Sequence, residues 1–330
     1  QDNVFAANGD DQIVIPFTDP LDIPAFGFDA PSRDRDSEVT FTSVYLQDQV
    51  GLTARVKVLV GFRYDRFDID VLDRIERDDG DSVDGDFGRV DEEVTPRLGV
   101  IFKPMENVSL YASYSETFLP LSGDQFLTLD LTSQGTRPQF YENREVGFKW
   151  DLRPDLALTT ALFELERESF TAVDPENPEQ TILVEGSTTR GAELQLTGAL
   201  TDRWSVTTGY SYLDGEVERA DGSGADGNDT RQTPEHMFSI WNSLQVTERL
   251  RLGLGATYQS SFFVQEDNSV EVPGYTRLDA AAYYQLSDTV RLQLNVENLL
   301  GEDYFPDAHS NNNITTGRPR NARLTLAVDL

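Results

Sequence analysis

Two stretches near the end of the chain, VRLQLNVE at 290–297 and ARLTLAVDL at 322–330, alternate apolar with polar residues. In an extended strand, a period of two puts the apolar side chains on one face and the polar side chains on the other. The segment between them, 298–321, is rich in Asn, Asp, Gly and Pro, which favour turns and loops. The end of the chain therefore predicts two strands joined by a long loop.

The same alternation recurs along most of the sequence, whereas helical periodicity is scarce. We count about 13 such segments, most of them about 10–13 residues long, which is the length that a tilted strand needs to cross a bilayer. The alternating residues that mark these strands lie at 39–50, 56–64, 94–102, 108–114, 146–152, 156–166, 192–200, 204–212, 236–246, 250–258, 278–286, 290–296 and 324–330, and each strand extends somewhat beyond them.

The connections between these segments alternate between short and long. In an antiparallel up-and-down sheet, successive connections fall at opposite ends, so all short turns gather at one end and all long loops at the other. Outer-membrane barrels have this asymmetry, with short periplasmic turns and long external loops. We therefore predict an all-β fold, an antiparallel up-and-down transmembrane β-barrel. The short connections are 51–53, 103–107, 153–155, 201–202, 247–249 and 287–288, and the long ones lie near 70–91, 119–140, 167–187, 214–233, 262–274 and 300–318.

Large aromatic residues stand near the ends of the apolar faces, as they do in the interfacial girdles of membrane barrels. The polar faces, such as Arg291, Gln293, Asn295 and Glu297, would then line the lumen. The alternative is a soluble β protein whose edge aromatics pack in its core. The expected girdle residues are Phe102, Trp150 and Trp204 beside short turns, and Tyr64, Tyr114, Tyr212 and Tyr258 toward the long loops.

Composition excludes several classes of function. The chain has 58 acidic and 27 basic residues and a net charge of -31, which argues against nucleic-acid binding. It has no cysteine, and its only histidines are His236 and His309, so we expect neither disulfides nor a metal site. No catalytic constellation stands out, and we expect that the protein is not an enzyme.

The N-terminal part is expected to differ from the rest. If the last strand ends at the short-turn side, residues 1–37, which contain four prolines, form an external loop, and residues 38–330 form the barrel portion. Bacterial single-chain barrels have even strand numbers. The odd number of expected strands therefore predicts that earlier strands belong to a longer protein.

Several stretches, taken together and in order, resemble TonB-dependent outer-membrane siderophore receptors. They include VYLQDQVGLT (44–53), SLYASYSETFLP (109–120), YENREVGFKWDL (141–152) and GRPRNARLTL (317–326). FLPLSGDQF (118–126) and HSNNNITTGRPR (309–320) are most similar to the catecholate siderophore receptor branch.

The resemblance implies a portion of a barrel of about 22 strands, whose plug domain and TonB box are not in this chain. It implies ferric siderophore transport, with catecholate-type cargo favoured, across the bacterial outer membrane. The implied partners are the ferric siderophore, the TonB complex of the full-length protein, and outer-membrane lipid and lipopolysaccharide. The protein is expected to be a monomer without a resident cofactor. The alternatives are another cargo on the same fold, such as cobalamin or an oligosaccharide, or a soluble β-rich binding or adhesion protein.

The long-loop end is the expected ligand-binding side. Guanidinium groups can hold anionic oxygens, and aromatic rings can stack on planar ligand groups. Alternatively, Arg190, Arg318 and Arg320 only line the lumen and pair with carboxylates. Acidic loops such as RADGSGADGND (219–229) oppose an anionic cargo, unless the cargo is less anionic, cations bridge, or basic residues lie deeper. The candidates are Arg137, Tyr141, Arg190, Arg231, His309, Asn311, Asn312, Arg318 and Arg320.

Overall fold

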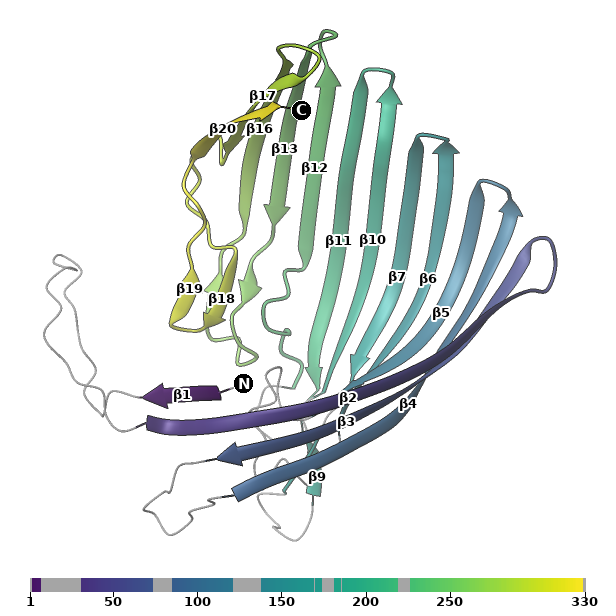
Figure 1. Ribbon diagram of the computed structural model, residues 1–330, viewed down its shortest axis with the longest axis vertical. Helices are drawn as coiled ribbons and strands as arrows, with labels where there is room; N and C mark the ends of the chain where they lie inside the picture. Colours follow the sequence, from purple (N-terminus) through teal and green to yellow (C-terminus); the bar gives the residue numbers. More distant parts are fainter. Residues whose placement is uncertain are drawn as a thin grey trace, which may run out of the picture. The chain divides into compact units, whose positions relative to one another are not determined.

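The segments in which apolar and polar residues alternate form one antiparallel sheet, and its strands follow one another in chain order (Figure 1). The computed structural model describes residues 2–6, 31–73, 85–120, 138–168, 170–173, 181–184, 186–218 and 226–328. In these residues the sheet has 14 strands, and every pairing with a described register is antiparallel. The described residues include no helix that is long and apolar enough to cross a membrane.

The strands of this sheet are β1 (Asp2–Ala6), β2 (Pro31–Gly51), β3 (Val56–Asp73), β4 (Gly85–Met105), β5 (Val108–Leu119), β6 (Gln139–Arg153), β7 (Leu156–Arg167), β10 (Gly186–Thr201), β11 (Trp204–Glu218), β12 (His236–Gln245), β13 (Leu250–Gln259), β16 (Tyr275–Gln285), β17 (Val290–Glu297) and β20 (Asn321–Val328). Three separate hairpins lie within long connections: β8 (Phe170–Val173) with β9 (Thr181–Val184), β14 (Phe262–Phe263) with β15 (Glu271–Val272), and β18 (Asp307–Ser310) with β19 (Asn313–Thr315).

The 13 expected strands correspond one to one with β2–β7, β10–β13, β16, β17 and β20, and the alternation of short and long connections is confirmed. Two details of the expectation are wrong. Residues 2–6 form β1, and β2 begins at Pro31, so these parts of 1–37 are strand and not loop. Both β2 and β4 have 21 residues, longer than expected, because the strands continue beyond the segments in which apolar residues recur with a period of two.

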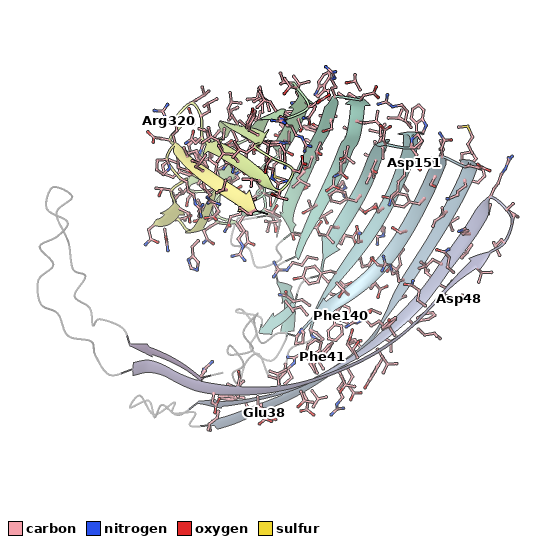
Figure 2. The ribbon with its side chains drawn as sticks, turned by 45° about the horizontal axis from the view of Figure 1, so that its top comes forward. Glu38, Phe41, Asp48, Phe140, Asp151 and Arg320 are labelled. Carbon is pink, nitrogen blue, oxygen red and sulfur yellow. The ribbon has the colours of Figure 1, made fainter. Side chains whose placement is uncertain are left out.

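The residues divide into two compact units. The first contains 1–46, 63–95 and 118–139, and its core is Ile69, Val71 and Phe87, with Val39 and Phe67 packed against them. The second contains 47–62, 96–117 and 140–330 and holds most of the sheet. In Figure 1 its tight turns, such as those joining β6 to β7 and β10 to β11, lie at the upper end of the strands. Figure 2 labels Asp151 near that end of β6 and Phe140 near the other.

Three of the short turns are built by the same side-chain chemistry. In LTARV (52–56), LTDRW (200–204) and VTERL (246–250), the threonine hydroxyl oxygen accepts hydrogen bonds from two backbone amides. Thr201 Oγ1, for example, accepts from the amides of Arg203 at 3.3 Å and Trp204 at 3.1 Å, and Thr53 and Thr247 do the same. A threonine at this position therefore satisfies amides that the ladder leaves unpaired.

Within the second unit, the apolar face of the sheet is exposed along much of its extent. The side chains of Val146, Leu162 and Leu254 are 53%, 59% and 53% exposed, although each lies in a well-paired strand. The cross-strand partners of the expected girdle residues place these on the same face: Phe102 pairs with Leu110, Tyr114 with Leu98, Trp150 with Leu158, Trp204 with Leu244, Tyr212 with His236, and Tyr258 with Phe238. For Tyr64 no partner is described. A girdle in the membrane interface stays a prediction.

The opposite face is polar, but aromatic rings lie on it against glycines of neighbouring strands. Trp241 covers Gly253 and Gly255, where an added Cβ would stand 2.4 Å from the indole ring in each case. Phe163 covers Gly191, and Tyr111 covers Gly147, in the same way. These glycines leave the space in which the rings lie flat on the sheet.

Candidate functional site

Three long connections of the second unit pack together at the long-loop end. They are residues 226–235 before β12, 260–274 with the β14–β15 hairpin, and 298–320 with the β18–β19 hairpin, and we call them the loop cluster. Phe262, Val264, Val272 and Ala308 form its core, with Val270, Phe305 and Ile314 packed against them. Because Val264 and Val272 of the second loop and Ala308 of the third are 0%, 1% and 3% exposed in one cluster, the two loops share a buried apolar interior.

The first loop is joined to the second by polar contacts. The Gln232 amide donates to the Phe263 carbonyl at 2.7 Å. Asn268 forms a reciprocal pair with Asp229: its Oδ1 accepts from the Asp229 amide at 2.9 Å, and its Nδ2 donates to the Asp229 carbonyl at 3.0 Å. Asn268 has a φ of 51°, a left-handed conformation that asparagine tolerates better than most residues.

The second and third loops meet around Asp267 and Asn311. The Asp267 carboxylate accepts from the Ser269 amide at 3.1 Å and the Ser269 hydroxyl at 2.9 Å, and Asn311 Nδ2 donates to it at 3.3 Å. These hydrogen bonds, first that of the Ser269 amide, lower the pKa of Asp267 below its ordinary value. Asn311 Oδ1 is buried and has no hydrogen-bond partner among the described residues.

A second polar network fastens the third loop to the polar face of the sheet. Asn298, which is 1% exposed and has a φ of 53°, donates from Nδ2 to the carbonyls of Glu302 at 2.8 Å and Arg318 at 3.2 Å. Its Oδ1 accepts from the Glu302 amide at 2.8 Å, and its own amide donates to Asp279 Oδ1 at 2.8 Å. One side chain thus holds both ends of the loop.

Arg277 completes this network. Its guanidinium donates to Asp279 Oδ2 at 2.9 and 3.1 Å and to the Tyr304 hydroxyl at 3.0 Å. The Tyr304 ring lies against Gly317, where an added Cβ would stand 2.4 Å away. Sequence reasoning missed Arg277, Asp279, Asn298 and Tyr304. The sequence did contain one indication of this network. Asn298 stands directly after β17 and is followed by Gly301, which has a φ of 73°.

The expected ligand-binding residues separate into groups. Six of them belong to the loop cluster: Arg231, His309, Asn311, Asn312, Arg318 and Arg320. Figure 2 labels Arg320, which is exposed and directly precedes β20. Tyr141 lies on β6, on the same polar face as Glu145. Arg137 lies outside the described residues.

Arg190 does not join the lumen or the loop cluster. Its register places it on the same face as Leu194, which is the exposed apolar face. There it forms a row of alternating charge across four strands, Arg144, Glu164, Arg190 and Asp214. Glu164 accepts from Arg144 at 3.0 Å and from Arg190 at 2.9 Å. The alternative that Arg190 lines the lumen is wrong, because the strand alternation continues unchanged past the apolar residues.

No group of three or more His, Asp or Glu residues that could hold a metal ion occurs in the part of the chain that the structure describes. The exposed charges of the loop cluster are mainly acidic, including Asp229, Asp267, Glu271 and Asp307, against the exposed arginines Arg231, Arg318 and Arg320. The acidic stretch 219–229 lies mostly outside the described residues.

Known proteins share this arrangement. Their antiparallel strands follow one another in chain order, one face of the sheet is apolar and exposed, and folded loops lie at one end. A family model described as "TonB dependent receptor-like, beta-barrel" matches residues 5–299. The chain belongs to this family. TonB-dependent receptor barrels are outer-membrane proteins of Gram-negative bacteria, and this places the chain in the outer membrane.

Two relatives of the chain are named as siderophore receptors. It is 32% identical over 89% of its length to the probable TonB-dependent siderophore receptor PiuA of Acinetobacter baumannii, covering 41% of that protein. It is 29% identical over 69% of its length to the catecholate siderophore receptor Fiu of Escherichia coli, covering 32%. The crystal structure of PiuA matches 99% of this chain with a TM-score of 0.84 and 28% identity, and the match covers 50% of PiuA. The chain thus spans no more than half of the relatives it matches.

Proposed function

We propose that this chain is the barrel portion of a receptor that imports ferric siderophores across the outer membrane in a TonB-dependent manner. The observation that carries the proposal is the folded loop cluster, at the loop end of a barrel that resembles siderophore receptors. A preorganised surface reduces the conformational entropy that ligand binding costs. We propose a receptor role rather than an enzymatic one, without a resident cofactor, in a protein that is monomeric and surrounded by lipid and lipopolysaccharide.

Within that proposal, a catecholate-type cargo is favoured. Fiu, a relative named for catecholate siderophores, supports this choice. The chemistry of the loop cluster offers the exposed guanidinium of Arg231 for anionic oxygens. The acidic side chains of the same cluster favour a cargo whose charge is partly neutralised. Cobalamin or an oligosaccharide remains the alternative cargo.

The test uses the full-length receptor that contains this chain. Its intrinsic fluorescence is titrated with a ferric catecholate, a ferric hydroxamate and cobalamin. We expect submicromolar binding of the ferric catecholate, and weakening by Arg231→Gln. As a control, Arg190→Gln should bind like the parent, because Arg190 lies on the outer face. Tight binding of cobalamin alone would replace the siderophore proposal, and binding of none of the three would refute it.

A further inference from the structure

A groove of about 720 Å³ opens on the apolar face of the second unit, away from the loop cluster. It runs over β11, β12, β13, β16 and β17, which lie side by side in the sheet (Figure 1). Its walls are Leu252 and Leu254 on one side and Leu294 and Val296 on the other. Its lining is almost entirely apolar, so water does not fill it favourably.

The groove exists because two alanines stand between larger residues. Cross-strand pairing sets Ala282 between Leu252 and Leu294, and Ala280 between Leu254 and Val296. Small side chains on the central strand, β16, leave a channel that follows the strand direction. A chain that lies along it contacts both walls, as an acyl chain does when it runs parallel to a tilted strand of a membrane barrel.

One polar side chain interrupts this apolar surface. Asn242 of β12 lies in the same cross-strand row as Leu254 and lines the groove. The indole Nε1 of Trp204 donates to Asn242 Oδ1 at 3.1 Å, and because indole nitrogen is only a donor, this contact fixes the orientation of the amide. Asn242 Nδ2 makes no hydrogen bond among the described residues, so two N–H groups face the groove without an acceptor.

An amide donor in hydrocarbon is unfavourable unless it is paired. Trp204 stands beside the short turn at 202–203, and tryptophan gathers at the level of the lipid headgroups and ester groups. A ligand that satisfies the site therefore has an apolar chain with an acceptor oxygen near one end. A fatty acyl ester has both parts.

We propose that this groove is a specific phospholipid site, in which an acyl chain lies over Ala280 and Ala282 and an ester carbonyl oxygen accepts from Asn242 Nδ2. The site is separate from cargo binding and does not depend on which siderophore the receptor carries. A second groove of about 690 Å³ on the same face, lined by Leu162, Ala192 and Leu194 among others, lacks such an amide. It serves as the internal comparison.

The experiment is native mass spectrometry of the full-length receptor, extracted from outer membranes and washed in detergent, with added phosphatidylethanolamine as the probe. We expect the parent to retain one phospholipid through the washes. The double substitution Ala280→Leu and Ala282→Leu should weaken binding by about tenfold or more, the loss of contact with about two methylene groups. Asn242→Leu should weaken it by about fivefold through loss of one hydrogen bond.

Ala192→Leu, which fills the comparison groove, should leave this retained lipid unchanged. Equal loss in Ala192→Leu and in the double variant would show that lipid coats the face without a specific site, and would overturn the proposal. Retention by Asn242→Leu at the parental level would do the same. A detergent-resistant dimer or a bound membrane protein, disrupted by the double variant, would assign the groove to a protein partner instead. The Asn242 variant keeps the apolar surface, so it tests the proposal even if the double variant fails to assemble.

Discussion

Replacing Asn298 with alanine removes three side-chain hydrogen bonds that hold the two ends of the third loop. At about 1 kcal/mol each, their loss costs the closed loop about 3 kcal/mol. Alanine at a φ of 53° adds about 1 kcal/mol, because an L residue with a Cβ is strained there. Asn298→Gly loses the same bonds without that strain, and it is the matched control.

The assay is hydrogen–deuterium exchange of the full-length receptor, followed at peptides that contain residues 299–302 and 317. The amides of Leu299, Gly301 and Gly317 all donate to backbone carbonyls in this region. We expect exchange there to rise about 100-fold in Asn298→Gly, and several times more in Asn298→Ala, while β12 and β13 stay protected. Parental exchange in both variants would refute the claim that Asn298 closes the loop.

Three further predictions follow from single contacts. Thr201→Ala should lower the free energy of unfolding by about 0.5–1.5 kcal/mol, measured by urea titration, whereas Thr201→Ser keeps the accepting oxygen and should be neutral. Gly253→Ala should destabilise by about 1–3 kcal/mol and shift tryptophan fluorescence, because its Cβ would displace the Trp241 ring, whereas at Gly209 the nearest atom is 3.7 Å away and alanine should fit. The pKa of Asp267 is lowered by folding, so its stabilisation is present above the ordinary aspartate pKa and is lost as the pH falls through the lower, folded-state value. Acidification should accordingly lower the protection factor of the Ser269 amide in the parent, which compares its exchange rate with that of an unfolded peptide at the same pH, and the protection factor in Asp267→Asn should not fall in this way.

The parts of the fold that could be predicted depend on residues close in sequence. Alternation such as Leu250, Leu252 and Leu254 is a local property, and it correctly predicted 13 of the 14 strands of the main sheet. Because the prediction relied on apolar residues, it made β2 too short: residues 31–37 form strand without any apolar side chain in a period of two. The alternative that placed Arg190 in the lumen has a related origin. It followed from the charge of the side chain, whereas the register of β10 places Arg190 on the apolar face.

The loop cluster could not be derived in the same way. Its contacts join segments far apart in sequence, as when Asn268 pairs with Asp229 and Asn311 bonds to Asp267. Nothing in a loop rich in Asn and Asp specifies which distant backbone groups it will satisfy. The residues Arg231 and Asn311 were proposed from their chemistry, but their common location depends on tertiary packing around Val264 and Val272.

The central claim is that the apolar face of the sheet meets lipid and the polar face meets water. The chain contains no cysteine, so, once any cysteine elsewhere in the receptor is replaced, single cysteines can be placed at each position from 250 to 258 and spin-labelled in the receptor reconstituted in outer-membrane lipid. The account predicts that collision with oxygen peaks at 252, 254, 256 and 258, and collision with a water-soluble nickel complex at 251, 253, 255 and 257. Equal accessibility along the strand, or the opposite phase, would contradict it.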